Sequence, residues 1–196
     1  MTTKQDELYA SFATLVEMMR DRGEDAAVLR GYTSDDLTEM AIRKSVFAID
    51  VPSARTRIIY HLAPKFKIVD IKKHVEESSD FDVYVLVTKE KLSTTAGKQL
   101  VELETVAKCS IDSFCVSELL FNISKHCLIP KHEPIRDDDA IQEIVTRYSL
   151  KGRQQLPLIF KTDPMARYLG LRPKELVKIT RYSPAAGEYV MYRCCV

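Results

Sequence analysis

Asp82-Val-Tyr-Val-Leu-Val-Thr88 is the stretch of sequence that decides the fold of the first part of this chain. The run is almost continuously apolar, which is typical of a β-strand that is covered on both faces. Other segments with strand patterns are residues 46–51, 57–62 and 111–116, and helical patterns lie between them at 69–77 and 93–103. Strands that alternate with helices predict an α/β arrangement with a mostly parallel or mixed sheet.

Two helices are expected before the first strand. The apolar residues at positions 8, 12, 15, 16 and 19 share one face of a helix, and Gly23 after them is a natural helix terminus. Ser34 is the expected N-cap of the second helix, which carries Leu37, Met40 and Ala41. Both helices precede the first expected strand.

The segment after residue 125 has a different pattern. Pro130 interrupts regular structure, and the acidic residues 137–139 are expected at the start of a helix, where the helix dipole favours negative charge. Asp163-Pro164 predicts an N-cap followed by proline in the first helical turn, and Gly170 ends that helix. Strands are expected over residues 158–161, 176–180 and 189–194. Together these elements predict a small α+β domain.

The charge balance changes at the same place. Residues 126–196 carry 12 Lys and Arg against 8 Asp and Glu, whereas residues 1–125 carry 17 against 20. The coincidence of this change with the change in pattern predicts two domains, residues 1–125 and residues 126–196.

The composition is that of a soluble globular protein. Hydrophobic residues make up 45% and charged residues 29% of the 196 residues, and the formal net charge is +1, which excludes a strongly basic nucleic-acid-binding protein. No apolar run is long enough to span a bilayer, so no membrane partner is expected. The N-terminus lacks the apolar core of a signal peptide, and the five cysteines form no CxxC pair. Both features lead us to expect an intracellular protein with reduced thiols.

The second segment has a dense pattern of proline, glycine, tyrosine and charged residues at fixed spacing. The positions are His126, Pro130, Lys131, His132, Arg147, Tyr148, Leu156, Pro157, Asp163, Pro164, Ala166, Arg167, Tyr168, Gly170, Val177, Lys178, Ile179, Arg181, Ser183, Gly187, Tyr189, Tyr192 and Arg193. In this register the segment resembles the C-terminal assembly domain of the fifth-largest subunit shared by eukaryotic nuclear RNA polymerases. That domain is equivalent to a separate small subunit of the archaeal RNA polymerase. The first segment is less similar, with matches at residues 19–23 and 82–91.

The resemblance implies a structural subunit of a DNA-directed RNA polymerase, with no active site, cofactor or metal of its own. Residues 126–196 are then the assembly domain, which packs on the largest polymerase subunit and on neighbouring small subunits. Residues 1–125 are the jaw domain, which lies beside the downstream duplex DNA. The implied location is the nucleus for a cellular protein. Large DNA viruses encode their own versions, for which a virion or a cytoplasmic viral factory is implied.

The resemblance also implies which residues bind partners. These are His126, Pro130, Lys131, His132, Arg147, Tyr148, Pro157, Asp163, Pro164, Ala166, Arg167, Tyr168, Gly170, Arg181, Tyr192 and Arg193. For Arg167, a two-pronged bond to a partner carboxylate and a pair with Asp163 inside the fold are both open. Weak, salt-sensitive contact with DNA is expected at Arg55, Arg57, Lys65 and Lys67, because cations near phosphates release counterions. The alternative for these four is a solvated face interspersed with acidic residues.

The chain departs from the family pattern in two places. Arg172-Pro173-Lys174 replaces a turn that ends in glycine in the family, so the backbone position with positive φ is expected to be handled differently. Pro184 stands where the family tends to have an acid, and Glu188 where it tends to have arginine. This charge reversal affects any contact that the hairpin between residues 183 and 187 makes.

Other functions remain open from the residues alone. Asp50, Asp70 and Lys72 permit the two carboxylates and lysine of a metal-dependent nuclease. His126, Cys127 and His132 suggest zinc, but a structural zinc site needs four closely spaced ligands. A free-standing adaptor that has kept the assembly domain for another complex is the third alternative.

Overall fold

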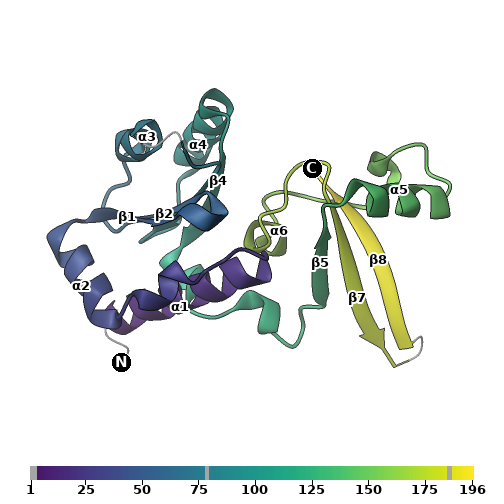
Figure 1. The fold of residues 1–196 in the computed structure, drawn as a ribbon, viewed down its shortest axis with the longest axis horizontal. Coiled ribbons are helices and arrows are strands. Elements are labelled where there is room, and N and C mark those ends of the chain that lie inside the picture. The colour runs from purple at the N-terminus through teal and green to yellow at the C-terminus, as the bar shows by residue number, and fades with distance from the viewer. Residues whose placement is uncertain (1–3, 78–79, 185–186) are drawn as a thin grey trace. The chain divides into compact units, whose positions relative to one another are not determined.

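The chain forms two compact units in a computed structural model, which describes residues 4–77, 80–184 and 187–196 (Figure 1). Unit 1 is Met1–Phe121 and unit 2 is Asn122–Val196. The division lies slightly before the position expected from the sequence. The reason is the short 3₁₀ helix η4 (Ile123–Lys125), which contacts helix α6 (Pro164–Tyr168) and so belongs to unit 2.

Unit 1 is built on a four-stranded mixed sheet in the order β1-β2-β3-β4. The strands are β1 (Val46–Val51), β2 (Thr56–His61), β3 (Val83–Thr88) and β4 (Ser110–Cys115). β1 and β2 are antiparallel, whereas β2, β3 and β4 run parallel. Val85, Leu86 and Val87 of β3 are completely buried, which confirms the strand covered on both faces that the sequence predicted.

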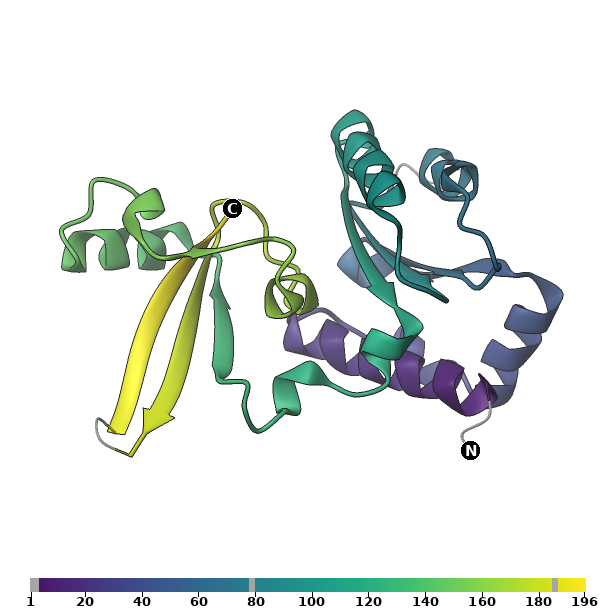
Figure 2. The same ribbon diagram turned by 180° about the vertical axis from the view of Figure 1, so that it is seen from behind.

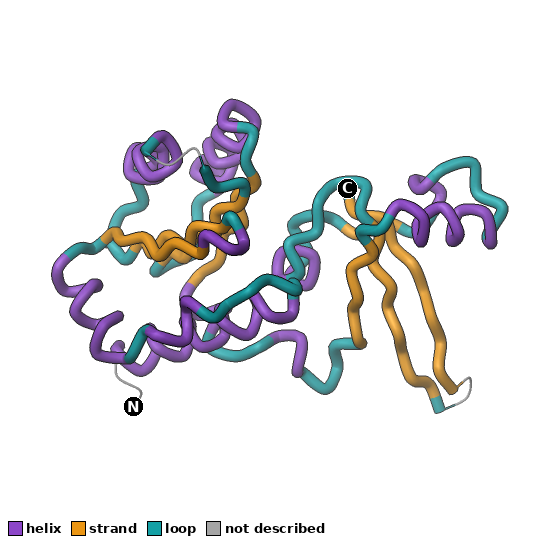
Figure 3. The backbone as a smooth tube through the Cα atoms, in the orientation of Figure 1, coloured by secondary structure: helices purple, strands orange, loops and turns teal. Residues whose placement is uncertain are grey.

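Helices α3 (Ile68–Glu76) and α4 (Thr94–Ala107) make the crossovers and cover one face of this sheet (Figures 1 and 3). Their apolar side chains form a core with alternate residues of the strands. The buried members of this core are Ile59, Ile71, Val75, Tyr84, Leu86, Leu100, Leu103 and Ile111. Ser93 caps α4 by accepting a hydrogen bond from the Ala96 backbone at 3.2 Å.

The other face of the sheet packs on helix α1 (Lys4–Asp21), where Ser11 Oγ lies 3.4 Å from the hydroxyl of buried Tyr60. Gly23 has φ 80° and ends α1, as predicted. Helix α2 (Ser34–Arg43) follows the 3₁₀ turn η1 (Val28–Gly31). Its N-cap is Thr33, which exchanges hydrogen bonds with Asp36, so the predicted cap Ser34 is wrong by one residue. Two further 3₁₀ turns are η2 (Pro52–Ala54) and η3 (Val116–Leu119).

Unit 2 contains a second four-stranded sheet, in the order β5-β7-β8-β6. The strands are β5 (Lys131–Ile135), β6 (Leu158–Ile159), β7 (Leu176–Ser183) and β8 (Gly187–Cys195). β5, β7 and β8 pair antiparallel, and β6 pairs parallel with the end of β8. The two long strands extend further than the sequence predicted, and β5 was not predicted at all. The turn expected at residues 183–187 lies partly outside the described residues.

Helix α5 (Asp138–Arg147) packs on one face of this second sheet. Ile141 and Ile144 of α5 form a buried cluster with Leu156, Leu176 and Cys194, close to the short 3₁₀ turn η5 (Arg153–Gln155). The Asp137 side chain accepts a hydrogen bond from the Ala140 backbone at 2.9 Å and so caps α5, in agreement with the predicted acidic helix start. No helix in the described part of the chain is both long and apolar enough to cross a membrane.

Candidate partner-binding surface

The hairpin of β7 and β8 presents exposed aromatic side chains. Tyr182 is 81% exposed and Tyr189 is 53% exposed. Tyr182 lies opposite Glu188, to which its hydroxyl donates a hydrogen bond at 3.3 Å, and Tyr189 lies opposite Arg181. The two tyrosines therefore stand on opposite faces of the hairpin, which extends beyond β5 in both views (Figures 1 and 2). Glu188 has an internal role in this hairpin, which gives the departure from the family pattern a local explanation.

The same sheet has open strand edges. β5 pairs only with residues 176–180 of β7, and β6 pairs only with Cys194 and Cys195 of β8. Among the described residues, no strand pairs with the outer edge of β8 between Gly187 and Arg193. Unpaired strand edges offer a row of N–H and C=O groups to another chain. This edge and the exposed tyrosines are features of one hairpin.

One face of the sheet collects several of the predicted partner-binding residues. His132 lies opposite Ile179, and Arg193 lies opposite Val177. Since residues 177, 179 and 181 alternate along β7, Arg181 lies on the same face as these two pairs. Arg181 is exposed, whereas Arg193 is half-buried and donates from Nη1 to the Leu158 carbonyl at 3.1 Å. Arg193 thus supports β6, and Arg181 is the more exposed of these two arginines.

His132 is held in one tautomer. Its Nδ1 lies 2.7 Å from the Pro130 carbonyl, which only accepts, so Nδ1 carries the proton. Burial lowers the pKa of His132, although the bond to Pro130 partly opposes this shift. The charges of Asp163, Arg181 and Arg193 also act on the ring. His132 is therefore a half-buried neutral ring at neutral pH, and its protonation changes the charge of this face.

Several predicted partner-binding residues have a structural role in α6. Asp163 caps this helix by accepting from the Met165 backbone at 2.9 Å, and Pro164 occupies its first turn. Ala166 and Tyr168 are buried, and Gly170 has φ 62° where the chain leaves the helix. The backbone bonds from Leu171 to Ala166 and from Gly170 to Arg167 complete a Schellman ending. These residues cap, bury and end α6 and so have structural roles. Half-buried Arg167 stays a predicted partner contact.

The remaining predicted positions of unit 2 lie outside this face. Arg147 is exposed on α5 and pairs with Glu143 at 2.6 Å. Tyr148 is half exposed and meets Tyr192 edge-on, with the ring centres 5.9 Å apart. His126, Lys131 and Pro157 are also exposed. Lys131 pairs with Glu133 at 2.7 Å, and the Pro157 carbonyl accepts a hydrogen bond from the Cys194 backbone at 2.9 Å. The structure therefore does not gather all predicted residues into one patch.

The two arginines of unit 1 that were expected near DNA both form ion pairs with carboxylates of the same unit. Arg57 forms two hydrogen bonds with Asp50, and only 12% of its side chain is exposed. Arg55 pairs with Asp82 at 3.2 Å and remains well exposed, as do Lys65 and Lys67. Contact of Arg57 with a phosphate would require these bonds to break.

A basic hollow of about 440 Å³ lies where β2 and β3 end and α4 begins. Three lysines, Lys65, Lys89 and Lys91, line it together with one acidic residue, Glu90, and the N-terminal residues of α4. Buried His61 forms part of its wall, and its Nε2 lies 3.5 Å from a carboxylate oxygen of Asp70. Helix N-termini and lysines both favour anions, so this hollow is the part of unit 1 best suited to a phosphate.

The nuclease alternative conflicts with this geometry. The Asp50 carboxylate accepts two hydrogen bonds from Arg57, and Asp70 faces His61 from helix α3. In the described part of the chain, no three His, Cys, Asp or Glu side chains form a group that could hold a metal ion. Asp50 and Asp70 therefore do not form the paired carboxylates that such a nuclease needs.

Comparison with known proteins identifies the family. The model of the family described as "RNA polymerase Rpb5, C-terminal domain" matches residues 121–195. A Dictyostelium discoideum protein, "DNA-directed RNA polymerases I, II, and III subunit rpabc1", is 34% identical over 164 residues, which cover 83% of this chain and 80% of that protein. This chain belongs to the Rpb5 family of RNA polymerase subunits.

Two other relatives of the Rpb5 family cover nearly the whole chain. The Caenorhabditis briggsae "DNA-directed RNA polymerases I, II, and III subunit RPABC1" is 29% identical, over 98% of this chain and 86% of its own length. The Arabidopsis thaliana "DNA-directed RNA polymerase V subunit 5C" is 30% identical, over 96% of this chain and 83% of its own length. The predicted resemblance and the predicted role as a non-catalytic polymerase subunit are thereby confirmed.

Within this Rpb5 chain, the altered turn keeps the backbone of a glycine. Lys174 has φ 76°, and its N–H donates to the Cys195 carbonyl at 2.9 Å. The expectation that the turn would handle the positive φ differently is therefore wrong. The lysine itself adopts the left-handed conformation, and the bond to Cys195 helps to hold it.

Proposed function

We propose that unit 2 docks this subunit on the largest subunit of an RNA polymerase and on neighbouring small subunits. The single observation that carries this proposal is the β7–β8 hairpin, which combines an open strand edge with two exposed tyrosines. Tyrosine and arginine contribute most strongly to protein interfaces, because they offer a large rigid surface with a polar end. The proposed contacts are thus the Tyr182 and Tyr189 rings, Arg181, and the backbone of the β8 edge.

Strand addition is the mode of binding that this edge supports. A partner segment that pairs with β8 satisfies the backbone groups between Gly187 and Arg193, and alternate side chains of the partner reach the two faces of the hairpin. Arg181 and Tyr189 then meet the partner on one face, and Tyr182 meets it on the other. In α6, Arg167 is a further proposed contact, whereas Ala166 and Tyr168 are buried inside the fold.

Docking is tested by affinity purification of the tagged full chain from cells that contain the polymerase. The double variant Tyr182→Ala and Tyr189→Ala is expected to reduce recovery of the largest subunit by about tenfold or more, as for hot-spot residues. Tyr9→Ala is the matched control, since Tyr9 is an exposed tyrosine of α1 in unit 1. Unchanged recovery with the double variant would sink the proposal.

Unit 1 is the proposed jaw, placed beside the downstream duplex. The basic hollow at the start of α4 supports this role, because Lys65, Lys89 and Lys91 surround a helix N-terminus. Exposed Lys67 follows Lys65 along the chain, whereas Arg55 lies beside Asp82 at the opposite end of β2 and Arg57 has an internal partner. The net charge of +1 limits the interaction to weak contacts made once the polymerase has positioned the DNA.

The DNA contact is tested by fluorescence anisotropy with a duplex at several salt concentrations. Replacing Lys65 and Lys91 by Gln is expected to reduce the salt slope by about 2, since each phosphate contact contributes about 0.9. Lys151→Gln changes an exposed lysine of unit 2 and serves as the control. An unchanged salt slope in the double variant would show that the hollow does not contact DNA.

The proposed location follows from the polymerase. A cellular protein of this family is placed in the nucleus, and a viral one in the virion or the cytoplasmic viral factory. The organisms of the three relatives described above are eukaryotes, which supports the nuclear location.

A further inference from the structure

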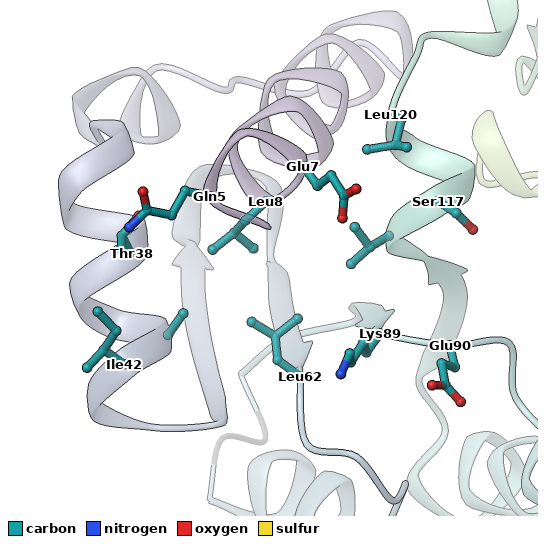
Figure 4. A pocket seen from close by; sticks show the side chains of 12 residues that line it. Gln5, Glu7, Leu8, Thr38, Ile42, Leu62, Lys89, Glu90, Ser117 and Leu120 are labelled. Atoms are coloured by element: carbon teal, nitrogen blue, oxygen red, sulfur yellow. The ribbon is translucent and has the colours of Figure 1, made fainter. Parts of the chain in front are cut away.

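Unit 1 contains an apolar groove that lies beside the basic hollow and shares the lining residues Lys89 and Glu90 with it (Figure 4). It lies between α1, α2, the ends of β2 and β3, and η3, and it has a volume of about 470 Å³. Leu8, Ile42, Leu62 and Leu120 turn aliphatic side chains toward it. The volume lies within the range of ordinary ligand sites, so the groove is large enough to receive side chains of a partner.

The walls of the groove leave large aliphatic side chains in water. Ile42 of α2 is 78% exposed, and Leu120, just after η3, is 41% exposed. Leu8 at the inner end of the groove is buried, so the apolar surface is continuous from the interior to the rim. Contiguous exposed apolar surface with a polar rim is typical of an interaction site.

The rim carries an excess of negative charge. Glu7 in the first turn of α1 and Glu90 after β3 line the groove, and Lys89 is the basic residue among its lining residues. Two carboxylates against one ammonium favour a cationic group on the occupant. The apolar lining and the acidic rim therefore favour an occupant with an apolar segment that is flanked by Lys or Arg.

The backbone around the groove favours a helix over a strand as the occupant. β2 already pairs with β1 and β3 on its two sides, and the N–H of Leu62 donates to Ser45 at 2.8 Å. A peptide strand would thus find no free edge on β2. The long walls are instead the helices α1 and α2, and side-chain insertion between helices is the mode by which amphipathic helices bind.

We propose that this groove binds an amphipathic helix of a partner protein. The helix presents Leu or Ile side chains at i, i+3 or i+4, and i+7 to Leu8, Ile42, Leu62 and Leu120. A Lys or Arg on its flank faces Glu7 and Glu90. This is a second interaction surface, on unit 1, and it goes beyond the proposed docking through unit 2.

The test uses the full chain with isotope-labelled Ile, Leu and Val methyl groups and two synthetic peptides of about 16 residues, a length at which a helix forms readily on binding. Both peptides carry Leu at i, i+3 and i+7, and they differ only in Lys or Glu on the flank. We expect the Lys peptide to shift the methyl signals of Ile42, Leu62 and Leu120. It should bind about fivefold more tightly than the Glu peptide, as for a partly exposed ion pair.

Two variants locate the binding. Ile42→Asp is expected to weaken binding of the Lys peptide by about tenfold, and Glu7→Lys is expected to reverse the preference between the two peptides. Val106→Asp is the matched control, because Val106 is an 81% exposed aliphatic residue of α4 outside the groove. All three positions are at the surface, and thermal unfolding within about 2 °C of the wild type checks that each variant folds.

Three outcomes would overturn this inference. The first is equal binding of the two peptides, and the second is a shift pattern outside the groove. The third is a shift of the groove signals when the chain alone is concentrated, since a second copy would then be the occupant. None of these outcomes affects recovery of the largest subunit through the β7–β8 hairpin, so the two proposals fail separately.

Discussion

Arg57 and Asp50 face each other across the antiparallel pair of β1 and β2. Arg57 Nε lies 2.5 Å from Oδ1, and Nη2 lies 2.7 Å from Oδ2. The guanidinium also donates to the His74 carbonyl at 3.1 Å, and its central carbon lies 4.8 Å from the centre of the Phe81 ring. The bond to Asp50 raises the pKa of Arg57. One side chain thus connects the first two strands with the end of α3 and the start of β3.

Loss of this connection is expected to destabilise unit 1. Arg57→Ala should lower the free energy of unfolding by about 2 kcal/mol, the range of hydrogen bonds to charged groups, because Asp50 and the His74 carbonyl lose their donor. Urea unfolding followed by circular dichroism measures this change. Arg43→Ala, which removes an exposed pair with Glu39, should change the free energy by no more than about 0.5 kcal/mol. Equal effects of the two variants would contradict the role assigned to Arg57.

A second ion pair is more deeply buried. Arg22 follows α1, and its Nη2 lies 3.0 Å from Asp112 Oδ2 on β4, with side chains only 2% and 5% exposed. Asp112→Ala should cost about 3–5 kcal/mol, since it leaves a buried charge without its carboxylate. The double change Arg22→Met and Asp112→Leu should recover most of that loss, because replacing a whole buried pair by apolar groups is often neutral. The same urea titration compares them, and a double variant as unstable as Asp112→Ala would refute this account.

The sheet of unit 1 could be predicted from the sequence because strands such as β3 are locally apolar and the helices α2 and α4 have side-chain caps. β5 could not. Lys131 and Glu133 are charged, and Pro134 lacks an N–H, so nothing local favours a strand. β5 forms because it pairs with β7 at the outer edge of the second sheet, where a proline is tolerated. The paired residues are 41 (Ile135 and Leu176) to 49 (Lys131 and Thr180) positions apart, and a local pattern does not contain this information.

The candidate site was predicted only in part, for a similar reason. Residue identity cannot separate an arginine that faces solvent from one that is held by a distant carboxylate, and Arg57 became internal only when β1 and β2 paired. Tyr168 matched the family pattern but is 2% exposed, so its substitution would create a cavity instead of testing docking. Tyr182 was not selected from the sequence, and its 81% exposure makes it one of the proposed contacts.

The turn at Lys174 predicts a stabilising substitution. A residue other than glycine in the left-handed region is strained by its Cβ, and Lys174 has φ 76°. Lys174→Gly should therefore raise the free energy of unfolding by about 1 kcal/mol, while the backbone bond to Cys195 is kept. Differential scanning calorimetry of the full chain measures the shift. Lys174→Ala removes the same side chain but keeps the Cβ, so it should give no gain, and a gain equal to that of glycine would show that strain is not the cause.

His132 predicts a dependence of stability on pH. Burial lowers its pKa in the folded chain, whereas the unfolded chain has the ordinary value of about 6.5. As the pH falls below that value, the unfolded chain takes up a proton before the folded chain does, so the free energy of unfolding decreases down to the lowered pKa. The stabilising contribution is therefore complete above about pH 6.5 and is lost on acidification.

The variant His132→Asn isolates this contribution. The asparagine amide donates to the Pro130 carbonyl in place of Nδ1 but does not titrate, so the decrease in stability between pH 7 and pH 5 should be smaller than in the wild type. His74, whose pKa burial also lowers, contributes to the remaining slope in both proteins. Urea unfolding at a series of pH values provides the comparison. A profile of His132→Asn that coincides with that of the wild type would show that the buried ring does not control the acid sensitivity of unit 2.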